Sequence, residues 1–176
     1  MADTPPDAPP APPPTPPNRP TQPQREVVIN AQYIKDLSFE NPRAPQSLLQ
    51  QQQQPEVQVG IDVKAQAVAP GFFEVIITIH AEAKGGGERI FLVELAYGAV
   101  VSLNNVPEAD MAGALLVEAP RLMFPFARAI IANATRDGGF LPLTLQPIDF
   151  AQLLRQQQAQ AQAAAAASAA AGTATA

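Results

Sequence analysis

The stretch EVQVGIDVKAQA, residues 56–67, alternates apolar and polar positions with a period of two. From Val57 to Ala67 every second residue is valine, isoleucine or alanine, and the residues between them are polar or glycine. Because successive side chains of an extended chain point to opposite faces, this pattern predicts a long strand with one buried face. Pro70 and Gly71 follow it and indicate a tight turn into the next strand.

Three more strands are predicted around this one. Residues 73–82 alternate again, the glycines at 85–87 indicate a second tight turn, and residues 89–103 form a further strand. Upstream, a strand near Glu26–Asp36 is apolar on both faces, which favours a position between two neighbouring strands. Residues 41–55 are rich in proline and glutamine and too many for a tight hairpin, so they indicate a crossing loop.

Helical patterns come after the strands. Pro107 suits a first helical turn, Pro120 is expected to interrupt the run, and a second helix ends at Gly138. The apolar stripe of that second helix comprises Met123, Phe126, Ala127, Ile130 and Ala134. Asp149 is a plausible cap for a last helix, which should fray beyond Gln158, where no apolar stripe continues.

Strands followed by helices predict an α+β fold, a four-stranded antiparallel sheet with helices packed on one face. The other face has no cover within the chain, which indicates oligomerisation. Residues 25–158, about 130 in number, are enough for one core. Residues 1–24 hold 11 of the 20 prolines and residues 159–176 are rich in alanine, so both tails are expected to be disordered.

The charge and the residue types exclude several classes of function. The net charge is −5 and no basic cluster occurs, so the usual electrostatic drive for nucleic acid binding is missing. The absence of cysteine removes disulfides, thiolate catalysis and the common zinc sites. The start of the sequence does not resemble a signal peptide, and no apolar run approaches the roughly 20 residues that span a bilayer. We therefore expect a soluble, cytoplasmic protein.

Catalytic residues are not evident. The one histidine, His80, lies within a predicted strand, where a surface or interface position is the usual one. No serine, histidine and aspartate form a recognisable triad, and no histidine–carboxylate spacing indicates a metal site. Apolar stripes in place of a convergent polar pocket favour a binding protein without a cofactor over an enzyme.

Carboxylates mark one candidate binding surface, in the stretch YIKDLSFENPRAP, residues 33–45. In an extended chain Asp36 and Glu40 share one face, and the apolar residues between them take the other. Leu92 and Glu94 likewise share the outward face of the fourth predicted strand. A solvated strand end and an interface for a partner both fit this pattern.

The core of the sequence resembles the SecB family of protein-export chaperones over roughly residues 25–158. The matching segments are YIKDLSFENPRAP (33–45), QPEVQVGIDV (54–63), FEVIITI (73–79), ERIFLVEL (88–95) and the run from APRLMFPF to QPIDF (119–150). The resemblance implies a homotetramer built as a dimer of dimers. It also implies an ATP-independent chaperone that keeps unfolded precursors competent for export and delivers them to the SecA motor.

The same resemblance implies two binding sites. The SecA C-terminal zinc domain would contact Asp36, Glu40, Leu92 and Glu94. The groove for precursors would be lined by Leu48, Leu49, Gln53, Val59, Ile61 and Leu154. Gln53 stands where a tryptophan is common in the family, which weakens the aromatic part of that groove.

Two other functions are compatible with the sequence. A chaperone of the same fold dedicated to a single client, such as an antitoxin, would leave envelope precursors untouched. A structural module would use its apolar sheet for self-assembly alone and bind no client. An enzyme is the least expected class.

Overall fold

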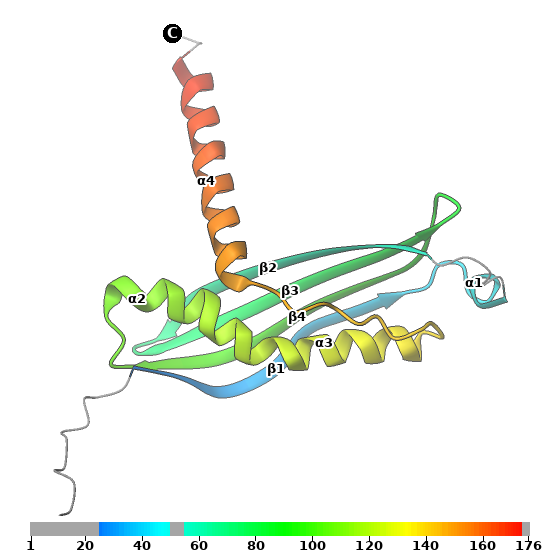
Figure 1. The fold of residues 1–176 in the computed structure, drawn as a ribbon, viewed down its shortest axis with the longest axis horizontal. Helices are drawn as coiled ribbons and strands as arrows, with labels where there is room; N and C mark the ends of the chain where they lie inside the picture. Colours follow the sequence, from blue (N-terminus) through cyan, green and yellow to red (C-terminus); the bar gives the residue numbers. More distant parts are fainter. Residues whose placement is uncertain (1–24, 50–54, 174–176) are drawn as a thin grey trace, which may run out of the picture.

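One four-stranded antiparallel sheet forms the body of the protein, in the order β1-β4-β3-β2 (Figure 1). The structure, a computed structural model, describes residues 25–49 and 55–173. The strands are β1 (Glu26–Glu40), β2 (Glu56–Ala69), β3 (Phe72–Gly85) and β4 (Glu88–Asn104). The predicted antiparallel sheet is therefore confirmed.

Glycine makes both of the predicted tight turns possible. Gly71 has a φ of 76°, and Gly86 and Gly87 have φ values of 61° and 82°, a region that side chains with a Cβ disfavour. The described part of the crossing segment between β1 and β2 includes a short helix, α1 (Gln46–Leu49). The glutamine run that follows α1 lies outside the described residues.

Strand β1 lies at an edge of the sheet, so the predicted position between two strands was wrong. Its pairing with β4 shifts register twice, between Ile29 and Ala31 and between Ile34 and Asp36. Each shift exchanges the residues that face the core with those that face away. Apolar residues therefore occur at odd and even positions although only one face of β1 lies toward the core.

Among the described residues, helices cover one face of the sheet and leave the other bare, as the sequence predicts (Figure 1). Helix α2 (Glu108–Gly113) continues through a π-helical turn, η1 (Ala114–Glu118), into α3 (Ala119–Asp137). Pro120 therefore does not interrupt the helix. It occupies the first turn of α3, where the wider turn before it accommodates the missing N–H group.

The core lies between α3 and the inward face of β3 and β4. Met123, Ala127 and Ile131 of α3 are fully buried at a spacing of four residues. Phe126, which we placed on this stripe, is 53% exposed, because it lies one position away from the buried row. On the sheet, Ile77, Ile79, Val93, Leu95 and Ala99 are buried against the helix.

The chain returns from α3 through residues 140–149 and enters α4 (Phe150–Thr173), which projects away from the sheet (Figure 1). Asp149 accepts a hydrogen bond of 3.0 Å from the backbone N–H of Gln152, so the predicted cap is confirmed. Helix α4 continues past Gln158, where we expected fraying, because alanine and glutamine favour helix strongly. The domain boundary at that point stays a prediction. Among the described residues, no helix has the length and apolar character needed to cross a membrane.

Candidate functional site

Three carboxylates and a leucine lie together on the bare face of the sheet. Backbone pairing sets Glu40 of β1 beside Leu92 of β4, and Ser38 beside Glu94. Asp36 precedes Ser38 by two residues and shares their face. We call Asp36, Glu40, Leu92 and Glu94 the acidic patch. The predicted grouping on one face is found in the structure, and its role in binding a partner stays a prediction.

Leu92 is much less accessible than we expected. It belongs to the bare face, but only 7% of its surface is exposed. The register places Glu40 on one side of it and Glu82 of β3 on the other. Leu92, which sequence alternation alone placed in the open, is therefore flanked by two long side chains on the same face.

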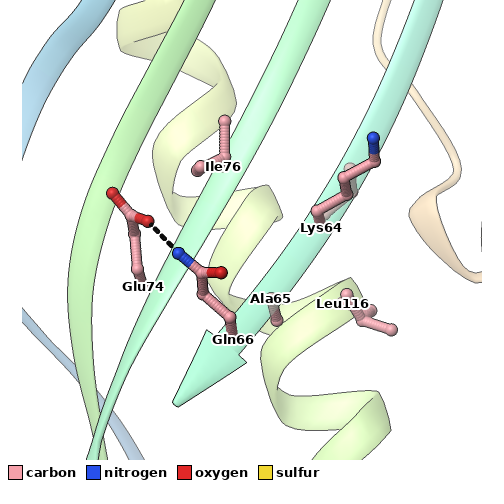
Figure 2. Close-up of a pocket in the computed structure, with 7 residues that line it drawn as sticks. Lys64, Ala65, Gln66, Glu74, Ile76 and Leu116 are labelled. Atoms are coloured by element: carbon pink, nitrogen blue, oxygen red, sulfur yellow. Dashed lines mark hydrogen bonds between the residues drawn. The ribbon is translucent and has the colours of Figure 1, made fainter. Parts of the chain in front are cut away.

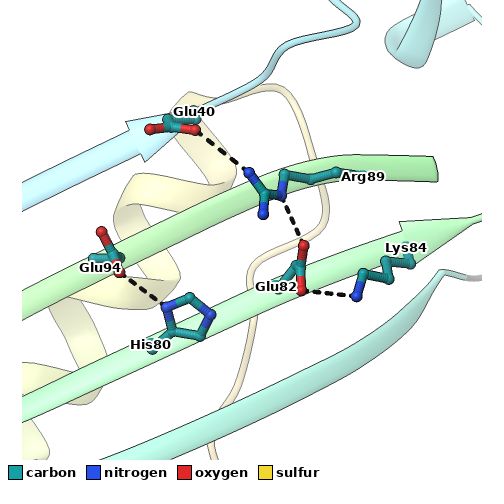
Figure 3. Close-up of polar contacts among 6 residues, drawn as sticks. All are labelled: Glu40, His80, Glu82, Lys84, Arg89 and Glu94. Carbon is teal, nitrogen blue, oxygen red and sulfur yellow. Dashed lines mark hydrogen bonds and ion pairs between the residues drawn. The ribbon is translucent and has the colours of Figure 1, made fainter.

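An arginine links the carboxylates on either side of Leu92 (Figure 3). The Nε atom of Arg89 lies 2.7 Å from Oε1 of Glu82, and its Nη1 atom lies 4.0 Å from Oε2 of Glu40. Lys84 also binds Glu82, with 3.0 Å between Nζ and Oε2. These cations, Arg89 first, lower the pKa of the Glu82 carboxyl below its ordinary value.

The histidine pairs with another member of the acidic patch. Nδ1 of His80 lies 3.0 Å from Oε1 of Glu94, and both side chains are about half exposed (Figure 3). His80 thus has the surface position that we expected for it. Its contact is a carboxylate of the neighbouring strand β4.

A second polar cluster holds β1 across the sheet. Glu74 of β3, only 7% exposed, accepts hydrogen bonds from three side chains. Lys35 of β1 donates at 2.8 and 3.0 Å, Gln66 of β2 donates at 2.7 Å, and the Tyr33 hydroxyl also donates. The Tyr33 ring crosses β4 above Gly98, where a Cβ would come within 2.7 Å of it. We call Tyr33, Lys35, Gln66 and Glu74 the Glu74 cluster.

The Glu74 cluster has shifted proton affinities. Hydrogen bonds from Lys35 and then Tyr33 are the main causes that lower the pKa of Glu74 to about 2. In return, the bond to Glu74 raises the pKa of Tyr33 to about 12. The carboxylate is therefore ionised and the phenol protonated across the whole physiological range.

This cluster fixes the direction in which the acidic patch points. Lys35 lies at the register shift between Ile34 and Asp36. Tyr33 already faces outward, so unbroken alternation would turn Leu37 outward and Asp36 inward. The shift at Lys35 reverses this, and the bonds to Glu74 hold Tyr33 before the shift and Lys35 at the shift.

A pocket of about 390 Å³ lies beside the Glu74 cluster at the β2 edge. Figure 2 shows its lining, in which the amide of Gln66 points to the carboxylate of Glu74. Leu116 of η1 closes one side. Within the described residues no group of three or more histidine or carboxylate side chains is placed to hold a metal ion.

The residues predicted to line the precursor groove form two groups. Leu48 and Leu49 of α1 are 38% and 81% exposed, and Leu48 lies against Gly139 at the end of α3. Val59 and Ile61 lie on β2, which α4 reaches through a 2.6 Å hydrogen bond from Gln157 to Asp62. Leu154, half-buried, lies one turn before Gln157. Gln53 is outside the described residues.

Three phenylalanines next to α1 were missed by the sequence analysis as part of this region. The ring of Phe91 lies 5.8 Å from that of Phe39 and 5.0 Å from that of Phe140, between centroids. Phe39 packs so closely on Gly138 that a Cβ there would collide with its ring. The rings come from β1, β4 and the segment after α3, so no local pattern in the sequence unites them.

Comparison with known proteins gives a consistent result. The family model described as "Preprotein translocase subunit SecB" matches residues 20–161. A protein named "Protein-export protein SecB" from Bradyrhizobium sp. (strain BTAi1) is 53% identical over 134 residues, 76% of this chain and 83% of the relative. Its namesake in Rhodopseudomonas palustris (strain BisB5) is 51% identical over 134 residues, 76% of this chain and 84% of that protein.

A solved structure supports the fold. The Mycobacterium tuberculosis SecB-like chaperone, solved with a peptide from the HigA1 antitoxin, aligns with a TM-score of 0.58 at 15% identity. The alignment covers 69% of this chain and 90% of that one. At this identity the likeness concerns the fold alone.

The Glu74 cluster generates a pH prediction. Glu74 has a folded pKa of about 2 against an ordinary value of 4.5, so the unfolded chain takes up this proton first. The stability that the carboxylate confers is therefore present above pH 4.5 and is lost as the pH falls toward 2. Glu74→Gln should cost about 1–3 kcal/mol at pH 7.

Urea denaturation of both proteins between pH 7 and pH 2, at one protein concentration, checks this. The difference between wild type and Glu74→Gln should shrink below pH 4.5. Glu56→Gln, which changes an exposed carboxylate at the start of β2, is the matched control. A difference that stays constant down to pH 2 would contradict the assignment.

Proposed function

Because the chain belongs to the SecB family of preprotein translocase subunits, we propose that it is an ATP-independent export chaperone. It keeps unfolded secretory precursors competent for translocation and delivers them to the SecA motor. SecB is a family of chaperones and not of enzymes. Relatives about half identical over most of the chain are named protein-export proteins, so a chaperone for one antitoxin is not favoured.

The observation that carries this proposal is the separation of two surfaces by the sheet. The acidic patch lies on the bare face, where Glu40 and Glu94 are exposed. Val59 and Ile61 pair with Ala81 and Ile79 of β3, which belong to the covered, apolar face. A protein that holds a client while it contacts a motor needs two surfaces that do not compete.

The partner of the acidic patch would be the zinc domain at the SecA C-terminus. A small basic domain complements the exposed carboxylates, and opposite charges accelerate encounter as well as orient it. The client would occupy the apolar side, along Leu48 and Leu49 toward Val59, Ile61 and Leu154. Both partners place this chaperone in the cytoplasm, where precursors await export.

Exposed apolar residues support a homotetramer, a dimer of dimers. Ile34 and Leu37 of the edge strand β1 are 49% and 40% exposed. Leu122 and Phe126 of α3 lie one turn apart and are 52% and 53% exposed. An open strand edge and an apolar helix stripe are two separate surfaces, as two kinds of subunit contact require.

The tetramer is tested by light scattering of the full chain at micromolar concentration. The expected mass is four times the 18.6 kDa of one chain. Phe126→Asp should shift the population toward smaller species, because it places a charge in an apolar contact. A wild-type mass equal to one chain would contradict the proposal.

The two binding sites are tested by calorimetry of two variants against two ligands, the zinc-loaded SecA C-terminal peptide and an unfolded precursor. Glu94→Ala should weaken peptide binding several-fold, more at low salt, and leave precursor binding unchanged. Leu49→Asp should weaken precursor binding by about tenfold, because it removes an apolar contact worth about 1–2 kcal/mol. Peptide binding to Leu49→Asp should remain at the wild-type level.

Each variant has a control elsewhere on the chain. Glu56→Ala removes an exposed carboxylate outside the acidic patch, and Val68→Asp changes an exposed apolar residue at the far end of β2. Neither should alter binding of either ligand. If Glu94→Ala loses both ligands while it remains a tetramer, the two sites are not separate and the assignment fails.

A further inference from the structure

Arg89 has a position that the proposed function does not explain. It comes from the start of β4 and reaches carboxylates on the two strands that flank β4 (Figure 3). Its guanidinium lies 2.7 Å from Glu82 of β3 and 4.0 Å from Glu40 of β1. Since Leu92 is the β4 residue paired with both of these glutamates, the guanidinium spans the position of Leu92.

The burial of Leu92 agrees with this arrangement. A leucine on a sheet face without helices is expected to be open, whereas Leu92 is 7% exposed. The side chain of Arg89 is 46% exposed and that of Glu82 is 14% exposed, so the arginine is the more open to solvent of the two. Arginine stems often cover apolar surface in this way while the charged head stays in water.

We propose that Arg89 is a specificity-determining residue of the acidic patch, a cap that covers Leu92 until a cationic partner replaces it. This role rests on the proposed contact with the SecA zinc domain. A partner that supplies both a cation for Glu40 and an apolar side chain for Leu92 opens the cap. A partner with only the apolar side chain leaves Glu40 unpaired, and a partner with only the cation leaves Leu92 without an apolar contact. Either partner therefore binds more weakly than one with both features.

Lys84 provides the internal comparison. It binds Glu82 from the other side, at 3.0 Å, and carries the same charge as Arg89. Figure 3 shows it bound to Glu82 and not to Glu40, so it does not span Leu92. Removal of either cation makes the patch more negative, and only removal of Arg89 uncovers the leucine.

Calorimetry of the full-length tetramer with the zinc-loaded SecA C-terminal peptide measures the cap. Arg89→Ala should bind the peptide about five- to tenfold more tightly than wild type, and Lys84→Ala within about twofold of it. Arg89→Lys keeps the charge but lacks the planar guanidinium, so its affinity for the peptide should lie between those of Arg89→Ala and wild type. In a Leu92→Ala background, Arg89→Ala should change the affinity for the peptide less than twofold, because the apolar contact that the cap would uncover is then missing.

Methyl NMR of the free protein with a soluble paramagnetic agent tests the cap without any partner. The Leu92 methyl signals should broaden more in Arg89→Ala than in wild type, and equally in Lys84→Ala and wild type. Leu92 signals that respond alike in all three proteins would overturn the cap. So would peptide binding that is unchanged or weaker in Arg89→Ala, or equally tightened by Lys84→Ala. Failure of wild type to bind the peptide would instead overturn the proposed function, and NMR would still decide whether Arg89 covers Leu92.

Discussion

The bond between Glu74 and the edge strand is the constraint on which the rest of the binding face depends. Strand β1 has only one neighbour in the sheet, so backbone pairing alone holds it along one side. Tyr33 and Lys35 add side-chain bonds that cross β4 and end on β3. Gly98 permits this crossing, because a side chain at that position would meet the Tyr33 ring.

The register shift near Lys35 decides which face of the sheet the later residues of β1 point to. Between Tyr33 and Asp36 the strand gains one residue relative to β4, and everything after that point changes face. Phe39 then turns toward Phe91 and Phe140, and Glu40 turns toward Leu92. This one register shift thus sets both the aromatic packing on the covered face of the sheet and the acidic patch on the bare face.

Sequence analysis predicted the periodic parts of this molecule well. The alternation in residues 56–67 and 73–82 predicted two strands, and glycines predicted both tight turns; the inward residues are mostly buried on β3, whereas on β2 only Val63 is buried. It misplaced β1 because two register shifts make apolar residues appear at odd and even positions. Alternation has no means of reporting such shifts; at the second of them Lys35 binds Glu74, which lies 39 residues away in the sequence.

For the candidate site, the sequence predicted which residues share a face of the sheet, but not their burial or contacts. Asp36, Glu40 and Glu94 share one face as predicted, but the register shift at Lys35 decides that Asp36 points outward. Leu92 is 7% exposed, and its neighbours Glu40 and Glu82 and the arginine that links them come from three strands. The three-ring phenylalanine cluster likewise unites distant segments, and Gln53, where a family tryptophan is common, gives no hint of these rings.

The central claim is that the sheet separates a surface for the motor from a surface for the client. The most direct test titrates the zinc-loaded SecA peptide into the full-length protein twice, free and saturated with an unfolded precursor, while sedimentation reports what is bound. The account predicts a ternary complex and a peptide Kd that agrees within about twofold between the two titrations. Displacement of the precursor by the peptide, or a peptide Kd that rises in proportion to precursor concentration, would contradict it.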